Sequence, residues 1–570
     1  MFDIGLPELL LIGVVVLLLF GPEKLPEIAR SLGKGMQKVK QAQMQFQNEL
    51  NSVKEEMKVQ EDDIVEDPIN EMKKNVIKNV DDIKKNLRNL NKNWELDLLK
   101  PYFELRQQFE TGKESVVDTI NELLKEIDNK KDLNAFITLT SELAKKQAVI
   151  SQENFDSGKP RTLEGMVLAI KDNISTKDIR TTCASKMLEN YIPIYNATSV
   201  QKLVDAGAII IGKTNMDEFA MGSSNENSYF GNVLNPLNKE YVPGGSSGGS
   251  AAAVSAGLCH VSLGSETGGS VRQPASFTGI FGYKPSYGRI SRFGLVAFAS
   301  SLDQIGIFCN NLVDLSSVCD IITGVDENDS TSANLGPTRS SSKIENIYKN
   351  LRIGYVSDEV LNNCTDYVTK KYRSDLNKLK EEGHELIEIP IHYSEAWIPT
   401  YYIIATAEAS SNLARFDGVR FGFRPELNEG DNIYVKTRSN GFGMEVKRRI
   451  MLGTYVLSSG FYDAYYRKAQ QVRRKITDSY KSTFDKVDMV YMPTTPGSAF
   501  KFGSRNENPI KMYKADFYTA SANLAGVPAI NIPSGLDDEG MPFGMQIQCN
   551  NFEDEKMIGY ANYISKLINS

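Results

Sequence analysis

Two stretches rich in serine and glycine, GGSSGGS (Gly244–Ser250) and GSETGGS (Gly264–Ser270), stand close together in the sequence. The first runs into the alanine-rich segment 251–254, which favours a helix, and the second follows the apolar run 261–263. A flexible linker would have surroundings poor in structure, which is not the case here. Loops that lead into helices present backbone N–H groups that can hold a developing negative charge.

A lysine at the end of an upstream apolar run offers the base that a serine nucleophile needs. A serine hydroxyl is a weak nucleophile unless a nearby group takes its proton. Lys171 ends the run MVLAIK (Met166–Lys171), and desolvation at the end of a buried strand would lower its pKa toward neutrality. The sequence therefore predicts a Ser-Ser-Lys centre that cleaves amides.

Other motifs share parts of this pattern. A phosphate-binding loop would need a Gly-Lys-Ser/Thr ending, which the first stretch lacks, and a Ser-x-x-Lys motif is absent from both. The spacing Gly244-x-Ser246-x-Gly248 matches the nucleophile elbow of α/β-hydrolases, which needs an acid and a histidine downstream. His384 and His392 are available, but the charged neighbours of His384 predict a surface position. The third histidine, His260, falls between the two stretches.

Composition bounds the class of protein. With 570 residues we expect one large catalytic body plus attachments, and 41% hydrophobic with 24% charged residues is typical of a globular protein. The net charge of -7 gives no electrostatic reason to bind nucleic acid directly, so any RNA contact is expected through a partner. The six cysteines form no C-x-x-C pair, which predicts reduced packing thiols and no metal site; Cys183 is a weaker rival nucleophile.

The first fifty residues differ from the rest. Leu9–Phe20 is an apolar run shorter than the roughly 20 residues that span a bilayer comfortably. A secretory signal would need a basic start and a small-residue cleavage site, and a buried core helix is the other alternative. The segment after the Gly21-Pro22 bend has apolar residues at helical spacing and a basic face, which is typical of a helix on an anionic membrane surface.

The motifs MFDIG (1–5), ELLL (8–11) and FGPEKLPE (20–27) resemble the amino terminus of twin-arginine translocase subunits of the TatA/TatB family. The resemblance covers residues 1–50 and implies a short transmembrane helix and an amphipathic helix that work with TatC at the cell membrane. Residues 51–95 are rich in charge with aliphatic residues at helical spacing, which predicts a solvated helical linker, or alternatively a partner-binding coil.

From residue 96 to 570 we expect one α/β catalytic domain. Helices are predicted at Ser115–Lys125 and Asp132–Lys145. Short apolar runs predict strands of a buried sheet at Met166–Ile170, Ala208–Gly212, Leu351–Val356, Met489–Met492 and Ala529–Pro533.

This part of the chain resembles the amidase signature family, and within it the A subunits of glutamyl-tRNA(Gln) amidotransferases. The resemblance implies a mixed β-sheet core surrounded by helices. The motifs that carry it are GKPR (158–161), AIKDNI (169–174), TTCAS (181–185), GKTNMDEFAMGSS (212–224), VPGGSSGGS (242–250), GSETGGSVRQPA (264–275) and LDQIG (302–306).

Carried over by position, the resemblance makes Ser270 the nucleophile, Ser246 the bridging serine and Lys171 the base. It also implies a cis peptide bond between Gly245 and Ser246. The oxyanion hole would consist of the backbone N–H groups of Thr267, Gly268, Gly269 and Ser270.

For free glutamine, the site should offer one cation to the α-carboxylate and one anion to the α-ammonium. Arg449 and Asp516 match the positions that do this in the amidotransferases, with Tyr401 and Ser223 as further candidates. The alternative is that Arg449 belongs to an exposed helix face and that Asp516 is a surface carboxylate.

The resemblance further implies partners. A B subunit would use ATP and magnesium to activate Glu-tRNA(Gln) and would accept the ammonia, while a C subunit clamps the two; this chain itself would hold no metal or cofactor. The catalytic domain would be cytoplasmic and tethered to the cell membrane. Two alternatives are a stand-alone membrane-anchored amidase and a protein that is mainly a translocase component.

Overall fold

A computed structural model describes residues 99–390, 393–504 and 515–569 of the chain. The transmembrane helix, amphipathic helix and linker that the sequence predicts in residues 1–95 lie outside this part. Within the described ranges, none of the helices combines the length and the apolar character that a membrane crossing requires.

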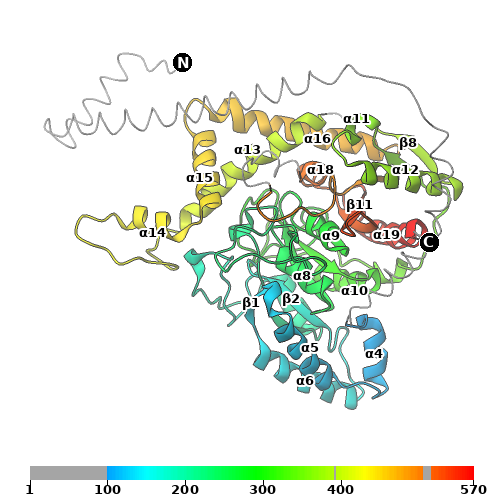
Figure 1. Cartoon of the computed structure of the whole chain (residues 1–570), viewed down its shortest axis with the longest axis horizontal. Coiled ribbons are helices and arrows are strands. Elements are labelled where there is room, and N and C mark those ends of the chain that lie inside the picture. Colours follow the sequence, from blue (N-terminus) through cyan, green and yellow to red (C-terminus); the bar gives the residue numbers. More distant parts are fainter. Residues whose placement is uncertain (1–98, 391–392, 505–514, 570) are drawn as a thin grey trace. The chain divides into compact units, whose positions relative to one another are not determined.

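A mixed sheet forms the centre of the described part of the chain (Figure 1). Its order is β1-β3-β2-β4-β6-β5-β10-β11-β9-β7-β8. Neighbours are parallel in β3-β2-β4 and in β9-β7-β8, and antiparallel across the middle from β4 to β9. The strands are β1 (Phe136–Leu139), β2 (Val167–Lys171), β3 (Ile209–Thr214), β4 (Val261–Glu266), β5 (Phe281–Lys284), β6 (Gln304–Cys309), β7 (Arg352–Tyr355), β8 (Glu385–Glu388), β9 (Met489–Pro493), β10 (Ala529–Leu536) and β11 (Pro542–Gln548).

The five strands predicted from apolar runs are all present, with ends displaced by three residues or fewer. Every residue of β2, β3, β4 and β6 is buried, as expected for strands covered on both faces. The α/β fold with a mixed sheet surrounded by helices is therefore confirmed.

The helix predicted at Asp132–Lys145 is wrong. Asn134 adopts a left-handed φ of 52°, and Phe136–Leu139 then forms β1, antiparallel to the edge of β3. The helix α6 begins only at Ser141. The aromatic and β-branched residues of β1 fit a pleated edge, so the free side of β3 decides the outcome against the local helical spacing.

The helix predicted at Ser115–Lys125 is present and longer, as α5. The longer helices are α4 (Tyr102–Glu110), α5 (Val116–Asn129), α6 (Ser141–Asp156), α7 (Thr198–Asp205), α8 (Gly248–Ser255), α9 (Arg272–Thr278), α10 (Leu312–Ile322), α11 (Asp358–Leu361), α12 (Asp366–Glu381), α13 (Ser394–Asn412), α14 (Ile433–Gly441), α15 (Met444–Leu457), a π-helix (Tyr462–Arg467), α16 (Lys468–Phe484), α18 (Phe517–Ala525) and α19 (Asp554–Asn569).

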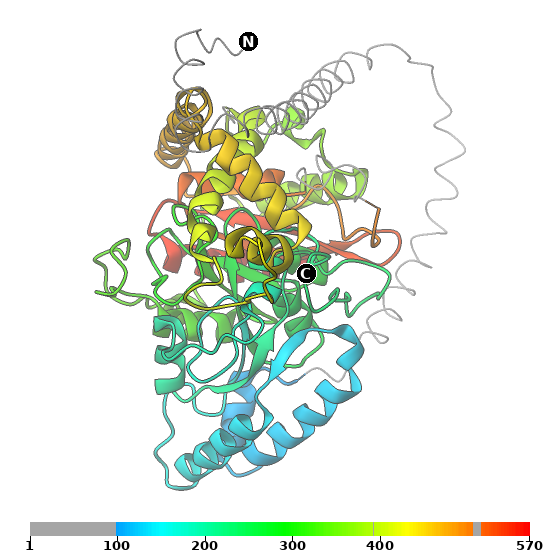
Figure 2. The ribbon, with the colours of Figure 1, turned by 90° about the vertical axis from the view of Figure 1, so that its left-hand side faces the viewer.

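Helices lie at both ends of the catalytic body and between them. Figures 1 and 2 show α5 and α6 at one end and α13, α15 and α16 at the other. The short helices α8 and α9 lie between them: α8 begins within the first serine-glycine stretch, at Gly248, and α9 begins just after the second. The sheet therefore brings both stretches to the middle of the body, where the site lies.

Candidate active site

Lys171 is the last residue of β2 and is completely buried. Its Nζ donates to Oγ of Ser246 at 2.8 Å, to Oγ of Ser247 at 2.7 Å and to the carbonyl of Ser265 at 3.1 Å. The peptide bond between Gly245 and Ser246 is cis, as the resemblance implies. The structure therefore brings the predicted base and bridging serine into direct contact.

Burial lowers the pKa of Lys171 to about 7, because an ammonium loses its hydration at this position. The carboxylates of Asp217, Asp303 and Glu266 act in the opposite direction and raise the pKa, but burial outweighs them. A large fraction of Lys171 is therefore neutral near pH 7 and able to accept a proton.

Ser270 lies in the turn between β4 and α9 and is 8% exposed. Across the described residues, the backbone N–H groups of Thr267, Gly268, Gly269 and Ser270 have no hydrogen-bond acceptor, and neither has the Ser270 hydroxyl. The next two N–H groups along the chain are bonded. A group of donors open to a ligand beside a serine hydroxyl can stabilise an oxyanion.

The buried ion pair of Glu266 and Arg272 holds this turn. Oε2 of Glu266 accepts from the N–H groups of Val271 and Arg272 at 2.9 and 3.0 Å. Nε of Arg272 donates to Oε1 of Glu266 at 2.9 Å. The same guanidinium donates to Gln546 and Asn523, both at 2.6 Å, so the start of α9 is fixed to the carboxyl-terminal half of the chain.

The predicted substrate residues Asp516, Ser223 and Tyr401 gather beside the glycines of this turn. The Ser223 hydroxyl donates to Oδ2 of Asp516 at 2.7 Å. A Cβ placed on Gly269 would lie 2.9 Å from Oδ1 of Asp516, and one on Gly268 would strike the Tyr401 ring. Asp516 is only 5% exposed, so it is not a surface carboxylate.

One oxygen of Asp516, Oδ1, is buried and lacks a hydrogen-bond partner in the described part of the chain. Burial raises the pKa of Asp516 to about 7, against the opposing effects of Ser223 and Arg449. An unpartnered buried carboxylate oxygen is costly, and a ligand cation would relieve that cost.

Arg449 lies on the inner side of α15 and is 4% exposed, so the exposed helix face is ruled out for it. Its Nε donates to Oε1 of Glu445 at 2.8 Å, and its guanidinium lies 5.6 Å from the centre of the Phe298 ring. Its positive charge lowers the pKa values of Asp516 and Tyr401, although burial dominates both.

Residues 118–558 match the family model described as Amidase. The chain belongs to the amidase family. The A subunit of glutamyl-tRNA(Gln) amidotransferase from Pelodictyon phaeoclathratiforme is 48% identical over 82% of this chain and 98% of its own length. The protein of the same name from Thermoanaerobacter pseudethanolicus is 49% identical over 80% and 93%. Residues 2–49 match the model of the mttA/Hcf106 family, so a TatA-like segment precedes the amidase part.

Solved structures agree with the fold of this amidase. The crystal structure of the glutamyl-tRNA(Gln) amidotransferase A subunit from Thermotoga maritima has a TM-score of 0.66 and 41% identity, covering 78% of this chain and 90% of that one. The native peptide amidase from Stenotrophomonas maltophilia has a TM-score of 0.69 and 25% identity, covering 83% and 97%.

Sequence reasoning missed several residues around the site of this amidase. Asp217 accepts from the N–H groups of Asn225 and Asn227, while its own N–H donates to the Ser246 carbonyl at 3.1 Å. Gln273 accepts from the Gly245 N–H at 3.0 Å. Both residues stand in motifs that carried the resemblance, but only the fold shows that they support the bridging serine.

The alternative catalytic residues, one cysteine and two histidines, do not form a second site in the described part of the chain. Burial raises the pKa of the Cys183 thiol well above its usual range, so Cys183 is a poor thiolate. His384 is buried, not at the surface as its charged neighbours suggested: Nδ1 accepts from the Leu351 N–H at 3.2 Å and Nε2 lies 3.1 Å from the Tyr563 hydroxyl. His392 lies outside the described residues.

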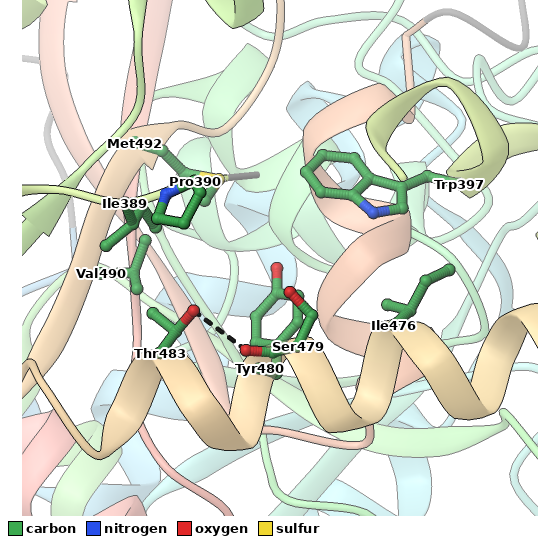
Figure 3. A pocket seen from close by; sticks show the side chains of 9 residues that line it. All are labelled: Ile389, Pro390, Trp397, Ile476, Ser479, Tyr480, Thr483, Val490 and Met492. Atoms are coloured by element: carbon green, nitrogen blue, oxygen red, sulfur yellow. Dashed lines mark hydrogen bonds between the residues drawn. The ribbon is translucent and has the colours of Figure 1, made fainter. Parts of the chain in front are cut away.

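Two pockets lie in the described part of the chain, and one of them reaches the turn that carries Ser270. Asp303, which accepts from the Thr267 hydroxyl at 2.7 Å, lines a pocket of about 190 Å³ with Arg292 and Asp329. Figure 3 shows a second pocket between α13, α16 and β9, where Trp397 faces Met492 across a space of about 20 Å³, enough for a water molecule. No cluster of three metal-ligating side chains occurs in residues 99–390, 393–504 or 515–569.

Proposed function

We propose that this chain is the glutamine-hydrolysing subunit of a tRNA-dependent amidotransferase. The observation that carries the proposal is the 2.8 Å contact between a fully buried Lys171 amine and Ser246. It lies next to a turn whose four N–H groups have no acceptor among the described residues. The names of relatives at 48% identity support the same function.

In the first step, the Ser270 oxygen attacks the side-chain carbonyl carbon of glutamine. The Ser270 proton passes to Ser246, and the Ser246 proton passes to the neutral Lys171 amine. The carbonyl oxygen becomes an oxyanion that the N–H groups of residues 267–270 stabilise. The C–N bond then breaks, and ammonia leaves with a proton returned through Ser246.

In the second step, water attacks the glutamyl-Ser270 ester. The same relay takes a proton from the water and returns one to Ser270, which releases glutamate and restores the hydroxyl. A lysine whose pKa is about 7 is suited to both directions of transfer near neutral pH.

Arg449 and Asp516 would recognise the α-carboxylate and α-ammonium of glutamine. Oδ1 of Asp516, which has no partner within the described residues, supports this assignment, since an ammonium donor would satisfy it. Tyr401 and Ser223 would shape the same subsite, because the first packs against Gly268 and the second holds Asp516.

A partner B subunit would activate Glu-tRNA(Gln) with ATP and magnesium and use the ammonia, and a C subunit would clamp the two. tRNA would be contacted mainly through these partners, as the negative charge of this chain favours. This chain would then need no metal or cofactor of its own.

The test is the glutaminase activity of Ser270→Ala with the partner subunits present. We expect activity to fall by at least about 10³-fold, because the nucleophile is lost. Hydroxylamine added to the wild type should yield glutamyl hydroxamate, which reports the ester. Unchanged turnover in Ser270→Ala would refute the assignment.

The amino-terminal segment supports a second role. The match of residues 2–49 to the mttA/Hcf106 family suggests membrane association, and we infer that this segment attaches the amidase to the cell membrane and contacts TatC. Residues 1–95 should restore export of a twin-arginine substrate in cells that lack their own subunit. Failure to restore it, with the segment present in membranes, would leave only the anchoring role.

A further inference from the structure

The carboxylate of Glu218 is buried where three distant segments meet, and the reaction described above does not use it. The Ser185 hydroxyl donates to its Oε1, and the Gly443 N–H donates to its Oε2 at 2.8 Å. Glu218 thereby joins the loop after β2 to the residue that precedes α15. The Glu218 N–H itself donates to the Asn227 carbonyl.

The contact with Gly443 depends on the absence of a side chain. A Cβ on Gly443 would strike Oε2 of Glu218. Gly443 has a φ of -70°, which any residue adopts, so space rather than backbone conformation requires glycine here. Burial raises the pKa of Glu218 to about 7, so the side chain is mainly an anion only above neutral pH. The anionic form is electrostatically favourable at the start of a 14-residue helix.

Each of the two segments that this contact joins also carries a residue of the proposed site or of its support. Asp217, the residue before Glu218, donates its N–H to the Ser246 carbonyl. On the other side, α15 carries Arg449 and its partner Glu445. Because a helix moves as a rigid element, the position of its first turn determines where the Arg449 guanidinium lies.

We propose that Glu218 is a positioning residue that fixes α15, and with it Arg449, to the segment that supports the bridging serine. This inference rests on the proposed recognition of glutamine by Arg449. Loss of the Glu218 carboxylate should weaken glutamine binding while leaving the chemistry of amide cleavage intact.

The first experiment compares Glu218→Gln with wild type in the assembled complex, on glutamine and on butyramide. Butyramide has the same amide end but lacks both α groups, so Arg449 does not contribute to its binding. We expect KM for glutamine to rise roughly tenfold, as when a buried hydrogen-bonded contact is weakened, and the kinetics with butyramide to stay within about twofold.

Glu164→Gln is the matched control, because Glu164 is a buried carboxylate paired with Arg161 in the loop before β2. An equal change of KM in this control, or equal effects on both amides, would overturn the proposal. Gly443→Ala should reproduce the Glu218→Gln defect from the opposite side, and the double variant should be no worse than either single variant. Additive defects would count against the contact.

Hydrogen exchange separates failure of this inference from failure of the proposed function. The amides of α15 in the complex should exchange at least several-fold faster in Glu218→Gln than in Glu164→Gln. If the wild type does not cleave glutamine, the proposed function falls, while the exchange rates still decide whether Glu218 holds α15. Unchanged α15 exchange would overturn the inference whichever amide is cleaved.

Discussion

At the scale of single residues, the buried amine of Lys171 predicts how activity depends on pH. Its pKa is lowered to about 7, so the amine is neutral and basic above pH 7 and protonated below it. We expect kcat for glutamine to fall about tenfold per pH unit on the acid side of 7, since kcat reports the substrate complex, in which the α-ammonium would keep Asp516 ionised. A pH profile of the wild-type complex checks this. An activity that stays constant from pH 7 down to about pH 5.5 would contradict it.

Asp516 predicts a defect of the opposite kind, in binding rather than chemistry. Asp516→Asn removes the charge that would pair with the α-ammonium, so KM for glutamine should rise about 10- to 100-fold, with kcat within a few-fold. Asp314→Asn is a suitable control, because Asp314 lies on α10 and accepts from the N–H groups of Tyr102 and Phe103 at the start of α4. A kcat loss without a KM change would contradict the assigned role.

At the scale of elements, the start of α9 depends on one ion pair. Burial alone would raise the pKa of Glu266, but Arg272 outweighs it and holds that pKa below its usual range. Arg272→Met leaves this carboxylate buried without its partner, and we expect a loss of about 3–5 kcal/mol in the free energy of unfolding. Urea denaturation measures the free energy of unfolding. A loss below about 1 kcal/mol would show that contacts other than this ion pair stabilise the turn.

The elements themselves are predictable from the sequence to different degrees. Fully buried strands such as β2, and β10 over its first half, show in the sequence as apolar runs, because both faces are covered. The edge strand β1 is not predictable in this way, since its four residues take their conformation from β3, which is distant in sequence. The surface position predicted for His384 is wrong for the same reason: its charged neighbours are exposed, but its ring packs against Tyr563.

At the scale of the whole molecule, the relatives predict what the amino-terminal part contributes. Glutamyl-tRNA(Gln) amidotransferase A subunits correspond over 98–99% of their own length to only 82% of this chain. Residues 96–570 alone should therefore fold, and with the partner subunits hydrolyse glutamine with a kcat within about twofold of that of the full chain. They should also move from the membrane fraction to the supernatant.

Cell fractionation and a glutaminase assay check both parts of this prediction. The full-length chain carrying Ser270→Ala is the control for localisation without activity. A shortened chain that stays with the membranes would show that the amidase part has its own attachment. A shortened chain that is folded but inactive would show that the first 95 residues support catalysis.

Only the site residues that belong to short sequence motifs are predictable from the sequence. Lys171, Ser246 and Ser270 stand in short recognisable stretches, so their identification needs no tertiary information. The support from Glu218 depends on contacts between segments far apart in the sequence, and so does the pairing of Ser223 with Asp516, 293 positions away. No local pattern encodes such a pairing, and only the completed sheet establishes it.

The strand order has a consequence for the newly made protein. Lys171 leaves the ribosome early, but Asp516 and the strand β11 that completes the sheet between β10 and β9 are made near the end. At about 5–20 residues per second, the roughly 380 residues from Lys171 to the end of β11 take on the order of 20 to 75 s. A chain whose translation stalls before residue 516 would therefore lack the carboxylate that we assign to the α-ammonium, and we expect no glutamine hydrolysis until synthesis is almost finished.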